Sequence, residues 1–118
     1  MPWNWNGLGE TGYVFFPNEC YNVKCHLNVI LHGCMNGKEM IGKSLVINSG
    51  FAEYAVTNNM ILLFPQAEFH YRKNFAGCWD YAHGPPSAKV YGDDDEDELF
   101  YTNKGVQNRA IKKMIEIL

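Results

Sequence analysis

The residues best suited to chemistry in this sequence are the tripeptide His32-Gly33-Cys34 and three further cysteines, Cys20, Cys25 and Cys78. The tripeptide directly follows an apolar run that has the length of a buried strand. In open α/β sheets, ligands lie beyond the carboxyl ends of the strands, so the tripeptide is placed where a backbone amide can face a substrate. A His-Gly pair also suits an ordinary turn, because glycine fits any tight reversal.

The four cysteines allow three disulfide pairings. Cys34 and Cys78 each lie past the carboxyl end of a predicted parallel strand, so we expect a bridge between them, and Cys20 with Cys25 then closes a short turn. Free buried thiols are one alternative. A zinc site is another alternative, because three histidines lie near cysteines in the sequence: His26, His32 and His83. Neither Cys-x-x-Cys nor His-x3-His spacing is present to support it. We expect no metal and no cofactor.

The elements that position these residues predict an α/β fold. Tyr13–Pro17 indicates an edge strand, His26–Leu31 a central strand and Met60–Phe64 a buried strand. Leu45–Thr57 has helical spacing, so two strands flank a helix and should run parallel. A terminal helix with Asn103 as its N-cap is predicted by a stripe of apolar residues: Val106, Ala110, Ile111, Met114, Ile117 and Leu118. The expected architecture is a small, mainly parallel sheet flanked by helices.

Length and composition place these elements in one domain, residues 1–118, with 47% hydrophobic residues and a formal net charge of -3. The acidic run Asp93–Glu98 is expected to be a solvated loop insertion. The sequence has no basic stripe for nucleic acid, and its longest apolar run, Asn59–Pro65, is too short for a membrane span. The start, Met1–Gly7, does not resemble a secretory signal.

Further motifs follow the tripeptide in order, at Ala55–Ala67, at Asn74–Asp80 (Asn-Phe-Ala-Gly-Cys-Trp-Asp) and at Thr102–Asn108. With these motifs the chain, from about Tyr13 to Leu118, resembles the catalytic domain of poly(3-hydroxybutyrate) depolymerases and related esterases of the α/β-hydrolase superfamily. The resemblance implies an α/β-hydrolase-like fold and hydrolysis of carboxylic esters, with a polyester or short ester as substrate.

The resemblance also implies roles for single residues. The backbone amide of Cys34 would form part of the oxyanion hole, with His32 and Gly33 shaping that loop. Trp79 and Tyr81 would line the ester cleft, although Trp79 could equally be a core residue. The family more often has two tryptophans where this chain has Tyr81 and Ala82. The resemblance therefore does not determine whether this chain is specific for polyesters.

A nucleophile is missing from the sequence. The Gly-x-Ser-x-Gly elbow of this fold is absent, since none of the three serines lies in such a motif: Ser44, Ser49 and Ser87. We therefore interpret the chain as the oxyanion and substrate-binding part of a depolymerase-like domain, inactive until joined to the rest. A non-catalytic protein that binds polyester or another apolar polymer is the alternative. The expected disulfides indicate an extracellular or secretory location.

Overall fold

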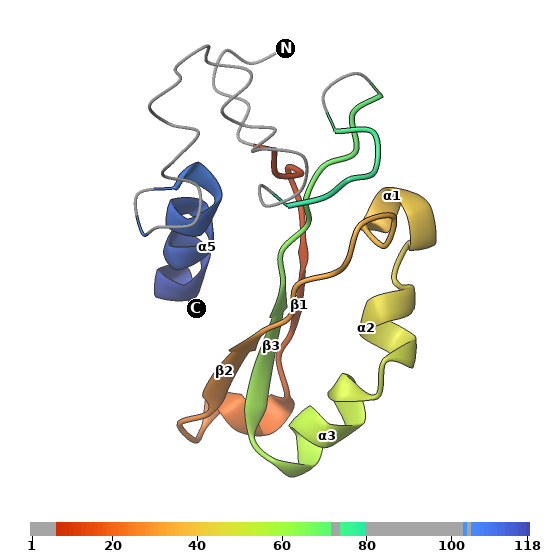
Figure 1. Ribbon diagram of the computed structural model, residues 1–118. Helices are drawn as coiled ribbons and strands as arrows, with labels where there is room; N and C mark the ends of the chain where they lie inside the picture. Colours follow the sequence, from red (N-terminus) through yellow and green to blue (C-terminus); the bar gives the residue numbers. More distant parts are fainter. Residues whose placement is uncertain (1–6, 72–73, 80–102, 104) are drawn as a thin grey trace.

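The computed structural model describes residues 7–71, 74–79, 103 and 105–118 (Figure 1). The acidic run 93–98, Tyr81, His83 and Ser87 lie outside the described residues. Within the described part, no helix is long and apolar enough to cross a membrane. The elements in chain order are β1 (Tyr13–Phe15), the 3₁₀ helix η1 (Asn18–Tyr21), β2 (His26–Val29), α1 (Lys38–Ile41), α2 (Ser44–Asn48), α3 (Phe51–Thr57), β3 (Met60–Phe64) and α5 (Val106–Ile117).

The strands form a sheet with the order β1-β3-β2 among the described residues. β3 pairs with β2 in parallel and with β1 antiparallel, so the predicted parallel pair is confirmed but the sheet is mixed rather than mainly parallel. The prediction that His26–Leu31 is a central strand is wrong, because β3 lies at the centre and β2 at an edge. The cause is visible in the sequence: His26 and Asn28 alternate with apolar residues along β2 and are exposed.

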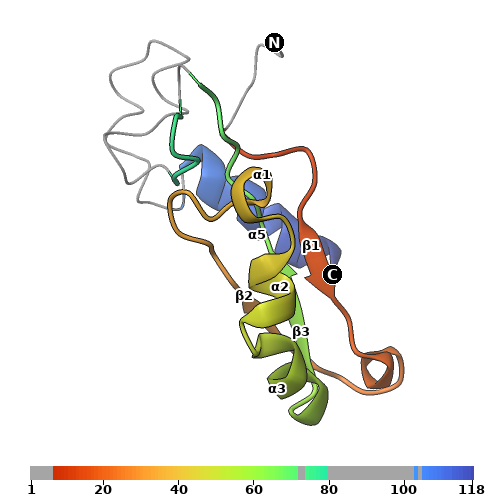
Figure 2. The same ribbon diagram turned by 90° about the vertical axis from the view of Figure 1, so that its right-hand side faces the viewer.

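Helices cover both faces of this sheet, with α1, α2 and α3 on one face and α5 on the other (Figures 1 and 2). Between α3 and the sheet lies an apolar cluster of Ala55, Leu62 and Phe64, all of which are buried. The single helix predicted over 45–57 is interrupted between α2 and α3. Gly50 has φ 83° there, a left-handed conformation that only glycine adopts without strain.

The second apolar cluster lies under α5. Leu8, Ala67 and Trp79 are buried in it, and the predicted helical stripe packs against them through Ala110, Ile111 and Met114. The helix begins at an N-cap of Gly105 rather than at the predicted Asn103. α5 therefore packs, through these three side chains, against the cluster that includes Ala67 and Trp79 from the segment after β3.

Candidate active site

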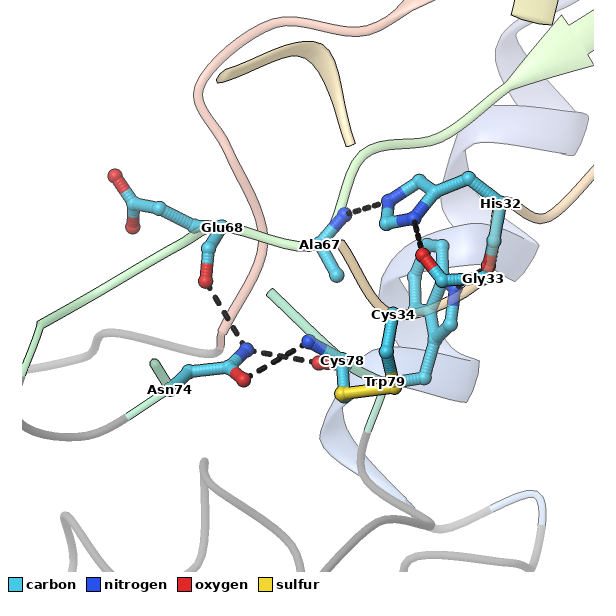
Figure 3. The surroundings of a disulfide bond; sticks show 8 residues. All are labelled: His32, Gly33, Cys34, Ala67, Glu68, Asn74, Cys78 and Trp79. Atoms are coloured by element: carbon cyan, nitrogen blue, oxygen red, sulfur yellow. Dashed lines mark hydrogen bonds between the residues drawn. A yellow bond between two sulfur atoms is a disulfide. The ribbon is translucent and has the colours of Figure 1, made fainter. Parts of the chain in front are cut away.

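The His32 side chain joins the loops that follow β2 and β3. It is 4% exposed, its Nδ1 lies 2.7 Å from the Gly33 carbonyl oxygen, and its Nε2 lies 3.0 Å from the Ala67 backbone nitrogen (Figure 3). A carbonyl can only accept and an amide N–H can only donate, so Nδ1 carries the proton and Nε2 accepts. Both ring nitrogens are therefore engaged with backbone, and the His32 side chain links the two loops.

The turn after β2 is closed by backbone hydrogen bonds. The Asn36 amide donates to the Gly33 carbonyl over 3.1 Å, and the Met35 amide donates to the Ala76 carbonyl over 2.7 Å. Met35 has φ 65°, so the left-handed residue of this turn is a methionine and not Gly33. Such conformations persist in non-glycine residues only where the surroundings enforce them. The ordinary turn that the His-Gly pair suggested is thus present at residues 33–36, but its left-handed position is Met35 and not Gly33.

Both predicted disulfides are confirmed. Cys34 and Cys78 form one bridge with Cα atoms 4.4 Å apart, and Cys20 and Cys25 form the other with a Cα separation of 5.6 Å. All four thiols are consumed, so the zinc and free-thiol hypotheses for the cysteines are wrong. The first bridge links the turn after β2 covalently to the loop that follows β3 (Figure 3).

Trp79 lies in the core among the described residues. It is 6% exposed, it packs in the cluster with Leu8 and Ala67, and its indole Nε1 donates to the His32 carbonyl over 2.8 Å. The His32 and Trp79 rings also contact each other, with centroids 5.2 Å apart. The structure thus favours the core alternative for Trp79 over its prediction as a cleft residue. The prediction for Tyr81 falls outside the described residues.

Asn74 is a buried polar residue to which the sequence assigned no role. Its side chain makes three hydrogen bonds, two of them to the backbone of Cys78. Gln66, also buried, accepts the Lys38 amide at the start of α1 through Oε1 over 2.8 Å. The sequence signal for Asn74 is its place at the start of the motif Asn74–Asp80, four residues before Cys78, since the hydrogen bonds of a side chain with loop backbone leave no periodic pattern.

The chemistry available at this place is electrostatic. A backbone amide held in a rigid turn beyond the carboxyl end of a strand can stabilise an oxyanion, because its dipole needs no reorganisation as charge develops. A nucleophile is not provided by the described serines, since Ser44 and Ser49 lie at the two ends of α2 rather than after a strand.

Two curated proteins are similar to this chain in sequence, whereas no family model matches it. Polyhydroxybutyrate depolymerase of Talaromyces funiculosus is 39% identical over 88 residues, which are 64% of this chain and 26% of the relative. Poly(3-hydroxybutyrate) depolymerase of Delftia acidovorans is 30% identical over 115 residues, which are 94% of this chain and 20% of the relative. The chain is related to the poly(3-hydroxybutyrate) depolymerases. It spans about a quarter or less of the length of these relatives.

Solved depolymerase structures also match the fold. The crystal structure of PHB depolymerase from Penicillium funiculosum has a TM-score of 0.62 and 32% identity, covering 78% of this chain and 36% of that chain. A PHB depolymerase variant complexed with an R3HB trimer has a TM-score of 0.72 and 33% identity, covering 94% of this chain and 35% of that chain. The α/β architecture described above is therefore that of a part of these depolymerases.

Proposed function

We propose that this chain is part of a poly(3-hydroxybutyrate) depolymerase-like carboxylic ester hydrolase, and that the Cys34 backbone amide contributes to its oxyanion hole. The observation that carries the proposal is the fixed turn after β2, which His32 clamps to the Ala67 amide and the Cys34–Cys78 bridge ties to the neighbouring loop. The relation to the depolymerases supports the reaction class.

In this mechanism the chain stabilises charge and another segment attacks the ester. A serine oxygen attacks the ester carbonyl, the carbonyl oxygen becomes negative, and a rigid N–H donor placed beside it lowers the barrier by roughly 2.7 to 4 kcal/mol. Because no Gly-x-Ser-x-Gly elbow is present, the serine must lie outside these 118 residues. His32 is unsuited to be its base, since both ring nitrogens bind backbone.

For the substrate we propose 3-hydroxybutyrate oligomers or polymer, because a matching structure is described as a complex with an R3HB trimer. Tyr81 is retained as a candidate contact to the ester chain. Trp79 is proposed to act indirectly, by supporting the His32 carbonyl, because it is buried. The two disulfides support an extracellular or secretory location, since such bonds persist in oxidising compartments.

The alternative function is binding of a polyester or another apolar polymer without catalysis. The absence of an elbow serine in the 118 residues favours it. The two functions predict different measurements. A binding protein should retain an R3HB trimer by itself, whereas a part of an enzyme should support hydrolysis once it is joined to the remaining elements.

A segment exchange tests the proposal. The matching segment of the Talaromyces funiculosus depolymerase is replaced by the segment of this chain, and hydrolysis of 3-hydroxybutyrate trimer is measured. We expect turnover that is lost when the nucleophilic serine of the recipient is replaced by alanine, while the isolated chain hydrolyses no activated ester. A folded but inactive exchange protein, together with trimer binding by the isolated chain, would establish the binding function instead. Phosphonate labelling of Ser44, Ser49 or Ser87 with matching turnover would refute both.

A further inference from the structure

Asn74 is buried beside the bridge and directs every polar atom of its side chain at backbone. It is 6% exposed. Nδ2 donates to the Glu68 carbonyl over 3.0 Å and to the Cys78 carbonyl over 2.8 Å, and Oδ1 accepts the Cys78 amide over 2.9 Å (Figure 3). The two donors and the acceptor of the carboxamide are thus all used, and two of the three contacts clamp one residue, Cys78.

We propose that Asn74 is a positioning residue for the turn that carries the Cys34 amide, acting through Cys78 and the disulfide. This inference rests on the proposed function, because it concerns the placement of the same amide. The mechanical connection is short: Asn74 fixes the backbone on both sides of the Cys78 side chain, and the Cys78 sulfur is bonded to Cys34.

A second connection runs through backbone. The loop from His70 to Cys78 is closed by paired hydrogen bonds, from the His70 amide to the Asn74 carbonyl over 2.9 Å and from the Asn74 amide to the His70 carbonyl over 2.8 Å. The Ala76 carbonyl in this loop accepts the Met35 amide. The residue directly after Cys34 is therefore also held by the loop that Asn74 organises, so Cys34 is constrained from its side chain and from its neighbour.

The chemistry of the site explains why asparagine occupies it. An isosteric aspartate would keep the acceptor for the Cys78 amide but would point a carboxylate oxygen at two carbonyl oxygens in a buried place. Alanine would leave the Cys78 amide and both carbonyls without these partners. A role limited to filling volume would tolerate a protonated aspartate, whereas a role that depends on both donated hydrogen bonds would not.

The first test uses the 118-residue chain with Asn74→Ala and, as a control, Asn58→Ala, which removes a hydrogen bond from Asn58 to the Tyr54 carbonyl on exposed α3. We expect amide hydrogen exchange at Met35 to rise by about tenfold or more in Asn74→Ala, with Ile30, whose amide donates to the Leu63 carbonyl of β3, unchanged. Asn58→Ala should alter neither amide. Equal loss of protection at Met35 and Ile30 would make Asn74 a general stability residue and overturn the proposal, as would no change at Met35.

The two disulfides give an internal comparison in the same samples. In a glutathione buffer, Asn74→Ala should shift the equilibrium of the Cys34–Cys78 bridge toward the dithiol by about tenfold, or about 30 mV, because the two thiols are less well aligned. The Cys20–Cys25 bridge should not shift. An unchanged Cys34–Cys78 equilibrium would contradict the link from Asn74 through Cys78.

Asn74→Asp separates donated hydrogen bonds from volume at low pH, where its carboxyl is neutral: a volume role predicts full recovery, and the loss of one donor predicts partial recovery. At neutral pH we expect it to perturb the Met35 amide and the Cys34–Cys78 bridge at least as strongly as alanine does. Lowering the pH until the new carboxyl is protonated restores an O–H donor for one of the two carbonyls, so part of the perturbation should be reversed. If Asn74→Asp behaves like the unsubstituted chain at neutral pH, the donated hydrogen bonds are unimportant and the proposal fails.

The activity test separates this inference from the proposed function. In the segment-exchanged depolymerase, Asn74→Ala should lower kcat about tenfold with KM changed less than about twofold, because an oxyanion donor acts mainly in the transition state. Inactivity of the exchange protein with Asn74 intact would count against the proposed function, while the exchange and redox measurements still decide the positioning role. Full kcat in an active exchange protein with Asn74→Ala would overturn the positioning of the catalytic amide.

Discussion

Two regions of the molecule are held together by different forces: the sheet face under α3, here called the apolar region, and the loops beyond the carboxyl ends of β2 and β3, here called the loop region. Near α3 the chain is fixed by apolar burial, with Ala55, Leu62 and Phe64 between helix and strands. Beyond the carboxyl ends of β2 and β3 directed bonds are added to the apolar cluster around Trp79: the buried polar residues His32 and Asn74 bind backbone there, and a disulfide joins the two loops.

This difference matches the structural requirement of each region. Apolar contacts are tolerant of small shifts, because dispersion and burial depend weakly on orientation. Hydrogen bonds and a disulfide fix direction as well as distance. A backbone amide that stabilises an oxyanion must be held in direction, so the loop region, which carries the candidate site, uses polar side chains at the cost of burying them.

The largest expected effects come from one buried aromatic residue in each region, Phe64 in the apolar region and Trp79 in the loop region. Phe64→Ala and Trp79→Ala should each lower the free energy of unfolding by about 3–5 kcal/mol, since both side chains are buried. More conservative substitutions distinguish the two regions. Trp79→Phe leaves the His32 carbonyl without its indole donor and should cost about 1–3 kcal/mol, whereas Phe64→Leu should cost less than about 1.5 kcal/mol.

Urea unfolding followed by far-ultraviolet circular dichroism measures both pairs without relying on tryptophan fluorescence. Val14→Ala, on the exposed part of β1, is the control and should change stability by less than about 0.5 kcal/mol. A Trp79→Phe variant as stable as the unsubstituted chain would show that burial alone holds the loop region. The proposed difference between the two regions would then be wrong.

The sequence predicted the apolar region under α3 better than the candidate site. Runs such as Met60–Phe64 identify a strand because burial depends on residue type, and the parallel pairing of β2 with β3 followed from the helical segment between them. The disulfide pairing was also predictable, since it required only that the loops after two parallel strands share one edge. These inferences need periodicity and chain order, and both are written in the sequence.

The arrangement within the site was not predictable in the same way. Trp79 is equally consistent in sequence with a cleft wall or a core residue, and the contact with the His32 carbonyl decides between them. The role of Asn74 and the left-handed Met35 depend on loop backbone that no hydrophobic pattern encodes. β2 was placed wrongly because a mostly apolar run outweighed its polar His26 and Asn28.

The two disulfides offer a sharper test of the comparison. They close loops of different length, with sequence separations of 44 and 5. In the loop-entropy model, removing the Cys34–Cys78 bridge by alanine at both positions should cost about 4 kcal/mol, and removing the Cys20–Cys25 bridge about 2 kcal/mol. Urea unfolding of the two double variants checks this order. Equal losses would mean that native contacts, and not chain entropy, set the value of the longer bridge.

The last comparison concerns two glycines, Gly12 beside the central strand and Gly33 in the turn after β2. A Cβ at Gly12 would lie 2.7 Å from the Phe64 carbonyl oxygen, which is backbone of the central strand and cannot move alone. A Cβ at Gly33 would meet only the Asn36 side-chain nitrogen, at 3.3 Å, and this flexible tip can rotate away. Gly12→Ala should therefore cost about 1–3 kcal/mol, while Gly33→Ala should change the free energy of unfolding by less than about 0.5 kcal/mol.

Thermal unfolding of both glycine variants, in the same buffer as the unsubstituted chain, measures this difference. The Gly33 result bears on the candidate site, because a stable Gly33→Ala protein can be carried into the segment-exchanged depolymerase with its fold intact. Any fall in kcat there would then report on space for the substrate beside the Cys34 amide and not on a distorted turn. A strongly destabilised Gly33→Ala protein would instead show that the turn tolerates no side chain at this position, contrary to the contact with Asn36 alone.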